Sequence, residues 1–405
     1  MRILHTSDWH IGRTFHGHST LEALRGVLEA LTDQVRALDV DVVIVAGDVF
    51  DTATPSAAAY TLLTDALVGL VDAGAQVVVT SGNHDSAARL GFQSRLLRDG
   101  IHVVTDPLTV GTPVLIDDEH SATSGPVAFY PIPFLEPVLV RSVFPGVELR
   151  SQADALGHAM SLVRADLAAR GGRSVAIAHC FAVAPAGDGA TDAGGPAPED
   201  TVTATAGLER VIQQGGLEFV PADVFDGPDY IALGHIHGRK RLSERVRYAG
   251  APLHYSFGER SRERGGWLVE IDGDGLSEVS WVSLPVPRRL VTITATFDEL
   301  LSDAAFEAHV EDWVSARYTD DLAVPDPMRR LQERFPHCAL VQHAPAERSE
   351  AEASTYARRV ADAVDHVALI DQFLRHVRAG VGAAERELEI IRDVVGEHAA
   401  AKASV

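Results

Sequence analysis

Residues 41–48 have the sequence Asp-Val-Val-Ile-Val-Ala-Gly-Asp, an apolar run that ends in a glycine and a carboxylate. An unbroken run of β-branched residues is typical of a strand covered on both faces, as in parallel sheets. Residues 2–6 and 77–80 are also short and apolar, and leucines and valines recur at helical spacing through residues 21–38. Pro55 opens a second helix before the third run. The sequence therefore predicts a β-α-β-α-β unit with parallel strands and right-handed crossovers.

Oxygen and imidazole donors follow these three strands and also follow two later apolar runs. The donors are Asp8, His10, Asp48, Asn83, His84, His179, His235 and His237. Any one of these clusters is common by chance, as a turn or as a solvent-facing strand end. Because ligands of open α/β sheets gather beyond the carboxyl ends of the strands, their occurrence at successive strand ends predicts a single site.

Seven of these donors suit a pair of divalent cations, since carboxylate oxygens and imidazoles bind such cations and seven are too many for one ion. Residues two apart in extended backbone point the same way, so Asp8 and His10 can bind one ion, and the Gly-His-Ile-His cluster repeats this geometry. Asp48 has two oxygens and can bridge both ions. We assign the first ion to Asp8, His10, Asp48 and His237, and the second to Asp48, Asn83, His179 and His235.

A paired cation site fits phosphoester hydrolysis, because two ions together lower the pKa of a shared water enough for attack on phosphorus. His84 adjoins the ligand Asn83 and is free to stabilise the developing charge or to protonate the leaving oxygen. Asp85 is expected to orient His84. Imidazole-rich ligation favours Mn²⁺ over Mg²⁺, although Fe²⁺ or Zn²⁺ could also bind.

The composition limits the classes of protein that this chain can belong to. It has 405 residues, 46% of them apolar, a formal net charge of −22 and two cysteines, Cys180 and Cys338. This charge argues against nucleic-acid binding over the whole surface but permits a local groove. The absence of a disulfide framework, of an apolar run long enough to span a membrane and of a signal peptide predicts a cytoplasmic protein with no membrane contact.

The chain divides into three parts by composition. Residues 1–284 carry the donors, and further strands are expected at residues 127–130, 175–178, 230–233, 247–249 and 267–271, with a long surface loop at residues 182–203. Residues 285–345, which follow a Leu-Pro-Val-Pro boundary, predict a small α/β unit. It comprises a strand at residues 289–296, a helix capped by Asp298, a helix at residues 327–335 and a strand at residues 338–342. Residues 346–405 hold a polar stretch and two amphipathic helical segments, separated by Gly380 and Gly382.

The ordered motifs resemble those of the calcineurin-like metallophosphoesterases, and within them the SbcD family of bacterial nuclease subunits. The superfamily pattern is Asp-x-His, Gly-Asp, Gly-Asn-His-Asp, His and Gly-His-x-His. Stretches similar to the SbcD family are His5-Thr-Ser-Asp-Trp-His-Ile-Gly, Gly47-Asp-Val-Phe-Asp51, Ser81-Gly-Asn-His-Asp-Ser, Tyr230-Ile-Ala-Leu-Gly-His-Ile-His-Gly and Tyr248-Ala-Gly-Ala-Pro-Leu-His-Tyr-Ser-Phe-Gly-Glu259. Archaeal and eukaryotic relatives have a second histidine where this chain has Asp51, so Asp51 is not assigned a catalytic role.

The resemblance implies a fold, a cofactor and partners. It implies an α/β metallophosphoesterase β-sandwich flanked by helices, two Mn²⁺ ions, and His84 as catalytic acid or transition-state stabiliser. It further implies DNA exonuclease and endonuclease activity, including hairpin opening, in break repair and recombination with an SbcC-type coiled-coil ATPase. Residues 285–345 resemble a capping domain, and the C-terminal helices resemble the segment that binds the coiled coil. A homodimer within a heterotetramer is also expected.

The sequence leaves three further questions open: the DNA contacts, the class of substrate and the surface that the C-terminal helices cover. DNA contacts are expected near the metal motifs, at Arg13, His16, Arg89, Arg239 and Lys240. A small-molecule or cyclic-nucleotide phosphodiesterase is the alternative function; it would use the same ions without a capping domain or partner helices. A non-catalytic scaffold ranks last, because every expected ligand is present. The C-terminal helices could alternatively fold back on their own domain.

Overall fold

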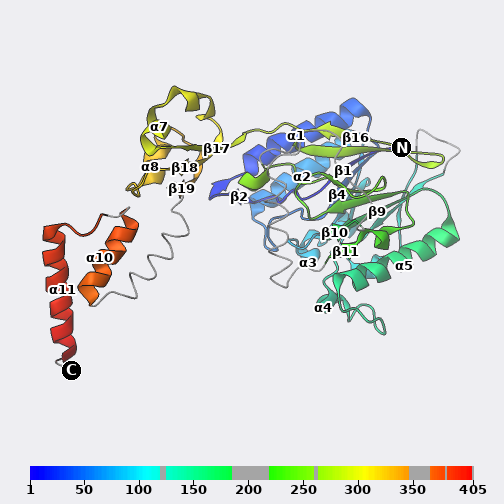
Figure 1. Cartoon of the computed structure of the whole chain (residues 1–405). Helices are drawn as coiled ribbons and strands as arrows, with labels where there is room; N and C mark the ends of the chain where they lie inside the picture. Colours follow the sequence, from blue (N-terminus) through cyan, green and yellow to red (C-terminus); the bar gives the residue numbers. More distant parts are fainter. Residues whose placement is uncertain (119–124, 185–218, 260–262, 346–364, 379–380, 404–405) are drawn as a thin grey trace. The chain divides into compact units, whose positions relative to one another are not determined.

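The computed structural model describes residues 1–118, 125–184, 219–259, 263–345, 365–378 and 381–403. The chain forms two units, Met1–Pro287 and Arg288–Val405 (Figure 1). Within the described residues, none of the helices combines the length and apolarity that a membrane span needs.

The first unit is built on two six-stranded sheets. In the first sheet the order is β16-β15-β1-β4-β5-β6. Its strands are β1 (Arg2–Thr6), β4 (Val42–Ala46), β5 (Gln76–Thr80), β6 (Ile101–Val104), β15 (Gly265–Asp272) and β16 (Gly275–Ser283). Strands β1, β4, β5 and β6 are parallel, whereas β15 and β16 are antiparallel to their neighbours. The predicted β-α-β-α-β unit is thereby confirmed.

The second sheet has the order β13-β14-β12-β9-β8-β7. Its strands are β7 (Val114–Ile116), β8 (Val127–Pro131), β9 (Ser174–His179), β12 (Tyr230–Gly234), β13 (Lys240–Arg241) and β14 (Val246–Tyr248). The four central strands are parallel, and β7 and β13 are antiparallel edges. The ends of β9 and β12 therefore lie at the same edge of this sheet, with Gly234 beside His179.

Helices cover the outer faces of the two sheets (Figure 1). The helices α1 (Leu21–Leu38) and α2 (Ala57–Asp72) share an apolar core with the first sheet, and α5 (Gln152–Arg170) shares one with the second. A third core lies between the sheets and includes Ile44, Val78 and Ile177. Burying each such side chain contributes about 1.5–3 kcal/mol. The expected β-sandwich flanked by helices is the fold observed.

Shorter elements connect these layers. They are β2 (Thr14–Phe15), β3 (His18–Ser19), α3 (Ala87–Leu90), η1 (Ser94–Leu96), η2 (Pro107–Thr109), α4 (Pro137–Val140), β10 (Ala182–Val183), β11 (Val220–Pro221), η3 (Ala222–Phe225) and η4 (Phe257–Glu259). The expected loop at 182–203 begins instead with strand β10, and its residues from 185 onward lie outside the described part of the chain.

The second unit begins with a three-stranded parallel sheet in the order β17-β18-β19. Its elements are β17 (Leu290–Ala295), α7 (Phe297–Ser302), η5 (Ala304–His309), β18 (Trp313–Tyr318), α8 (Pro327–Gln332) and β19 (Cys338–His343). The central strand β18 was missed from sequence. The cap of α7 was also wrong: Thr296 accepts the amide of Glu299 at 3.4 Å, and Glu299 accepts that of Thr296 at 2.9 Å. Asp298 lies inside the helix.

Two helices end the chain, α10 (His366–Val377) and α11 (Glu385–Ala403). They contact each other, and their link is held by two carboxylates. Asp371 accepts the amide of Ala383 at 2.7 Å, and Arg378 pairs with Glu387 at 2.7 Å. Phe373 on α10 is 52% exposed, so this helix pair leaves apolar surface uncovered. The polar stretch at residues 346–364 lies outside the described residues.

Candidate metal centre

The loops that follow β1, β4, β5, β9 and β12 bring the expected donors to one place. Three groups of side chains have ligand atoms within 4.8 Å of one another. They are Asp8, His10 and His237; His10, Asp48 and His84; and Asp48, His179 and His235. Because Asp48 and His10 each belong to two groups, the three groups form one continuous cluster.

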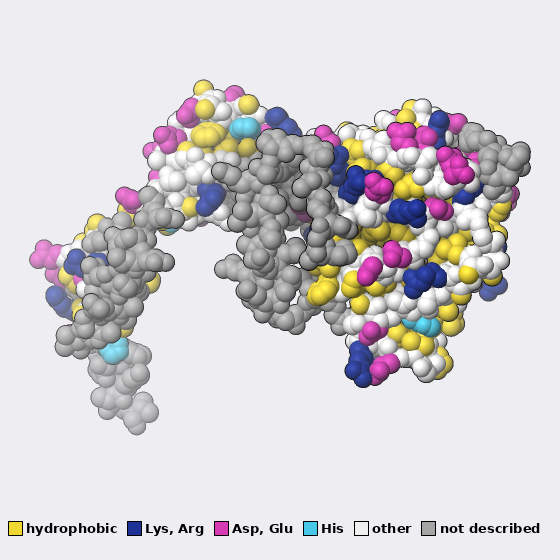
Figure 2. Space-filling model, turned by 45° about the vertical axis from the view of Figure 1, so that its right-hand side comes forward, with side chains coloured by type: hydrophobic (Ala, Val, Ile, Leu, Met, Phe, Trp, Pro, Cys, Tyr) yellow, Lys and Arg dark blue, Asp and Glu magenta, His cyan; other side chains and the backbone are white. Residues whose placement is uncertain are grey.

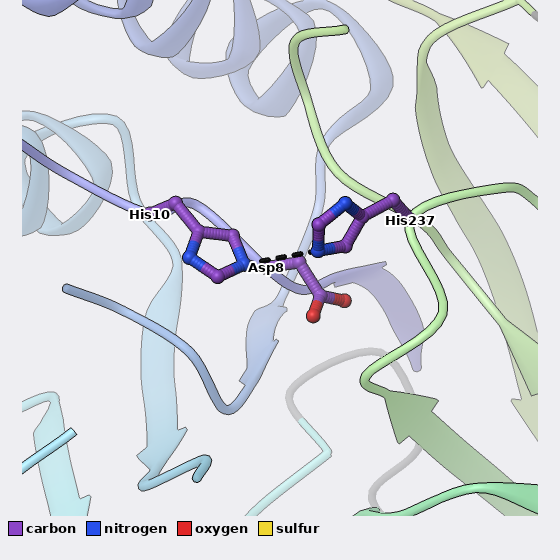
Figure 3. A group of neighbouring side chains, drawn as sticks. All are labelled: Asp8, His10 and His237. Atoms are coloured by element: carbon purple, nitrogen blue, oxygen red, sulfur yellow. Dashed lines mark hydrogen bonds between the residues drawn. The ribbon is translucent and has the colours of Figure 1, made fainter. Parts of the chain in front are cut away.

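The first group contains two imidazoles that face each other, those of His10 and His237. Nε2 of His10 lies 3.1 Å from Nε2 of His237, and Figure 3 shows the Asp8 carboxylate beside this pair of rings. The Asp8 carboxylate also accepts the backbone amide of His235, at 3.0 and 3.1 Å to its two oxygens. This bond ties the loop after β1 to the loop after β12, so the two halves of the site are joined at a ligand.

Asp48 lies between the two expected sets of ligands. Its Oδ2 is 3.3 Å from Nε2 of His179 and 3.5 Å from Nε2 of His10. The amide oxygen of Asn83 completes the second set, at 3.1 Å from Nε2 of His179 and 3.0 Å from Nδ1 of His235. The structure thus gathers all seven expected ligands, with the expected bridging carboxylate in the middle.

The backbone at the ligands differs from the expected extended form. Positive φ angles occur at Asp8 (53°), His10 (45°), Asp48 (48°) and His235 (104°). The i, i+2 extended geometry proposed for Asp8 and His10 was therefore wrong, and left-handed turns aim the two side chains. Non-glycine residues rarely adopt this region, and such strain clusters at functional sites.

Glycine is required where the loops cross closely. A Cβ on Gly234 would collide with the carbonyl of Ala46, and one on Gly82 would collide with the backbone and carboxylate of Asp48. These contacts leave no room for any side chain. They hold the loops close enough for ligands from different sheets to meet.

The charges of the site suit cations. Burial alone would raise the pKa of Asp48, but the neighbouring imidazoles of His179 and His10 outweigh it and hold this pKa well below its usual range. Burial would lower the pKa of His179, yet the Asp48 carboxylate raises it to about 9. Burial lowers the pKa of His235 to about 4. The carboxylates of Asp8 and Asp48 are buried, the imidazoles of His235 and His237 are half-buried, and the amide oxygen comes from the exposed Asn83. This converging set of carboxylates, imidazoles and one amide oxygen fits two divalent ions.

His84 lies at the rim of this cluster. Its backbone amide donates to Oδ1 of Asp48 at 2.9 Å, and its Nδ1 lies 2.8 Å from the backbone oxygen of Asp51. Its ring centre is 4.8 Å from that of His10. The Asp51 carbonyl accepts from Nδ1, and this bond does not engage Nε2.

Asp85 has a different role from the expected one of orienting His84. Its carboxylate accepts three backbone amides, from Val49 at 3.0 Å, Phe50 at 2.8 Å and Gly82 at 2.9 Å. The amides belong to the loops that carry Asp48 and Asn83. Asp85 therefore fastens these two ligand loops together, while the His84 ring is held by Asp51.

The five expected DNA contacts lie in different settings. Arg13 pairs with Asp51 at 3.1 Å, Arg89 donates to the backbone of Ala53 at 2.5 Å, and Arg239 lies over the Trp281 ring at 4.8 Å. The His16 ring lies 4.8 Å from that of Phe15, and Lys240 is exposed on β13. Arg13 is the one that the described contacts join to the metal cluster.

Sequence reasoning assigned no role to two carboxylates that lie beside the ligands, Asp51 and Glu259. Asp51 Oδ1 lies 3.2 Å from Nδ1 of His10, and Glu259 Oε1 lies 3.5 Å from Nδ1 of His237. Burial would raise the pKa of Glu259, but His237 and Arg264 lower it to about 2. Glu259 was visible as the last residue of a shared motif, but its partner could be found only in three dimensions.

Comparisons with known proteins agree with this geometry. A family model described as calcineurin-like phosphoesterase matches residues 1–152, and one described as type 5 capsule protein repressor C-terminal domain matches residues 286–378. The SbcD subunit of the nuclease SbcCD from Rhodobacter capsulatus is 36% identical over 315 residues, which cover 75% of each chain.

Two solved structures also match this chain. One is TT1561 of Thermus thermophilus, at 13% identity, covering 70% of this chain and 98% of that one with a TM-score of 0.38. The other is a dimetal phosphatase from Danio rerio, at 13% identity, covering 70% and 99% with a TM-score of 0.36.

Proposed function

This chain belongs to the SbcD family of nuclease subunits, and we propose that it cleaves DNA phosphodiesters with two divalent ions, together with an SbcC-type ATPase. The observation that carries the proposal is the position of Asp48, whose carboxylate lies within 3.5 Å of imidazoles from both ligand sets. A bridging carboxylate is what a paired-ion phosphodiesterase needs, and a single-ion site has no use for it.

The two ions, when bound, would neutralise the phosphate and supply an activated water. Asp8, His10 and His237 would hold one of them, Asn83, His179 and His235 the other, and Asp48 both. His84, its Nδ1 held by the Asp51 carbonyl, presents Nε2 to the substrate. From there it stabilises the charge that develops on phosphorus-bound oxygen or protonates the leaving oxygen. Its fixed orientation makes it a better candidate than a freely rotating side chain.

The remaining parts of the chain fit a complex. Residues 285–345 act as a capping domain that shapes DNA for cleavage, and residues 346–405 form a linker and helices that bind the coiled coil of the ATPase. The exposed apolar face of α10, with Phe373 and Leu369, supports this binding role, because a helix pair with uncovered apolar surface suits a helical partner. The proposal extends to a homodimer within a heterotetramer that acts in break repair and recombination in the cytoplasm.

DNA binding is proposed to be local rather than spread over the surface. Figure 2 shows lysine and arginine side chains interspersed with aspartate and glutamate on the face of the first unit in view. With a net charge of −22, the chain depends on the bound ions and on a few side chains near them for attraction to phosphate. Arg13, His16, Arg89, Arg239 and Lys240 are the residues we propose for this role.

Mn²⁺ is the proposed ion, because four imidazoles and an amide oxygen favour it over Mg²⁺. The alternative of a cyclic-nucleotide phosphodiesterase is not favoured, since the match of residues 286–378 to the second family model covers a part that such an enzyme does not need.

The deciding experiment is cleavage of a hairpin DNA by the chain purified with a coiled-coil ATPase, with Mn²⁺, with and without ATP. Cleavage of bis-p-nitrophenyl phosphate serves as a control for a working ion site. Activity on the small ester together with none on any DNA would contradict the nuclease function.

A further inference from the structure

A carboxylate stands behind each of the two histidines that face each other in the first ligand set. Nε2 of His10 and Nε2 of His237 point inward, 3.1 Å apart. On the opposite side of each ring, Nδ1 lies near a carboxylate: Asp51 at 3.2 Å from His10, as an ion-pair contact without hydrogen-bond alignment, and Glu259 at 3.5 Å from His237. Both rings thus have one nitrogen for an ion and the other for an anion.

An arginine holds each of these carboxylates in place. Nη1 of Arg13 lies 3.1 Å from Oδ1 of Asp51, and Nη2 of Arg264 lies 2.6 Å from Oε2 of Glu259. The Arg264 side chain is 1% exposed and also donates to the backbone oxygen of His237. The two arginine–carboxylate–histidine arms are therefore built alike, although their residues come from opposite ends of the first unit's sequence.

Tyr255 connects the two arms. The Arg13 guanidinium lies over the Tyr255 ring, 4.7 Å from its centre. The backbone amide of Tyr255 donates to Oε2 of Glu259 at 3.2 Å. Its hydroxyl donates to the backbone oxygen of Trp9 at 2.7 Å, next to His10. A movement of one arm would therefore be resisted by the other.

The histidines of the second ligand set are supported differently. Nδ1 of His179 donates to the backbone oxygen of Ala46 at 2.9 Å, a neutral acceptor. His235 turns its Nδ1 toward Asn83 Oδ1, at 3.0 Å. An anionic partner on Nδ1 fixes the tautomer and the ring orientation and makes Nε2 a stronger donor to a cation. The two ion positions are thus unequal.

We propose that Asp51 and Glu259 are positioning residues that selectively tighten the ion held by Asp8, His10, Asp48 and His237. The inference rests on the proposed two-ion function. The side chain of Asp51 acts on His10, whereas its backbone carbonyl acts on His84, so a side-chain substitution separates the two effects.

The test isolates each ion position in its own background. Asn83→Ala removes a ligand of the second position, and His237→Ala removes one of the first. Asp51→Asn and Glu259→Gln are introduced one at a time into each of these two variants, and Mn²⁺ affinity is measured by calorimetry. In the Asn83→Ala background, each addition should weaken binding by about 10–100-fold, and Asp51→Ala by more than Asp51→Asn. In the His237→Ala background, affinity should change by less than about twofold, because His179 rests on a backbone carbonyl.

Matched controls remove a carboxylate from an arginine pair elsewhere. Asp65→Asn loses the pair with Arg25 at 2.9 Å, and Glu244→Gln loses that with Arg241 at 3.4 Å. Neither should alter Mn²⁺ affinity in either background. If the Asp51 and Glu259 substitutions weaken Mn²⁺ binding equally in both backgrounds, these residues have a general structural role. If they leave Mn²⁺ affinity unchanged in the Asn83→Ala background, they have no role in binding this ion. Either result overturns the inference.

The two proposals fail in distinguishable ways. A wild-type protein that binds two Mn²⁺ and opens hairpin DNA, while its Asp51 and Glu259 variants bind normally, contradicts only this inference. A wild-type protein that binds fewer than two ions contradicts the proposed function as well.

Discussion

Replacing Asp85 with asparagine should loosen the metal centre without removing any ligand. The carboxylate accepts amides from Val49 and Gly82 on Oδ2 and from Phe50 on Oδ1. An asparagine has one acceptor oxygen, so in its best orientation it keeps two of these bonds and turns its NH₂ group toward the third amide. Losing one bond to a charged acceptor costs about 1.5–3 kcal/mol. For a unit of this size, that lowers the Tm by roughly 3–6 °C.

The Asp85→Asn effect should reach the ions, because the amides of Val49 and Gly82 belong to the loops that carry Asp48 and Asn83. We expect a lower Tm in EDTA and weaker Mn²⁺ binding in calorimetry, both at pH 8. Asp106→Asn is the matched control: Asp106 is an exposed aspartate that accepts one amide, from Leu108 at 2.9 Å, far from the ligands in sequence. It should leave Mn²⁺ affinity unchanged.

One competing effect could reverse this outcome. Burial raises the pKa of Asp85 to about 6, so the ionised carboxylate is costly to keep in the fold. Asparagine removes that cost. If Asp85→Asn has the Tm and the Mn²⁺ affinity of the wild type, or higher values, burial outweighs the three hydrogen bonds and the reasoning is refuted.

Three further predictions test separate parts of the chain. His84→Gln should lower DNA cleavage by about 10²–10⁴-fold with two Mn²⁺ still bound, as counted by metal analysis, and full activity would remove His84 from the mechanism. Gly82→Ala should abolish Mn²⁺ binding, because the added Cβ would collide with Asp48. Gly26→Ala is the control: its Cβ points into open space on α1, so Mn²⁺ binding should be kept and the free energy of unfolding should rise by roughly 0.5–1 kcal/mol. Equal Mn²⁺ binding isotherms for the two variants would contradict this prediction. Burial lowers the pKa of His5 to about 3, so the folded state excludes a proton that the unfolded chain binds below pH 6.5. Stability should therefore fall as the pH drops from 6.5, by about 2 kcal/mol at pH 5. Urea unfolding in EDTA should show a smaller loss of unfolding free energy between pH 6.5 and pH 5 for His5→Gln than for the wild type. An identical loss would refute the role of His5.

The sequence predicted the sheet framework because burial leaves a strong pattern. The runs ending at Ala46 and Thr80 are apolar at every inner position, and the structure buries them between layers. β18 carried a signal that was overlooked: in its sequence, Trp-Val-Ser-Ala-Arg-Tyr, the last five residues alternate between apolar and polar types, as in a half-buried strand. The position of the site followed from the sheet, because donors that come directly after neighbouring parallel strands lie at the same edge of the sheet.

The parts that sequence could not give depend on contacts between distant segments. The sequence pairs Asp85 with His84 because the two are neighbours in the chain. In the structure the Asp85 carboxylate accepts the amide of Gly82 and those of Val49 and Phe50, which are more than 30 residues away. Asp51 and Glu259 reach their histidines only after the sheets have packed. Positive φ angles at the ligands likewise carry no pattern, because aspartate and histidine are unremarkable in ordinary loops.

Those backbone angles suggest why the site needs so rigid a support. Each left-handed non-glycine residue costs about 1–3 kcal/mol, so Asp8, His10, Asp48 and His235 together cost an amount comparable to the net stability of a domain. The surrounding bonds offset this cost: the amide of Asp8 donates to the Gly47 oxygen at 3.0 Å, and that of His10 to the Asp48 oxygen at 2.9 Å. Ions that bind only the folded arrangement add their own binding free energy to it. The metal centre and the sandwich should therefore be mutually dependent, each ligand loop being held in its strained form by the sheets beneath it and by the ions that it binds.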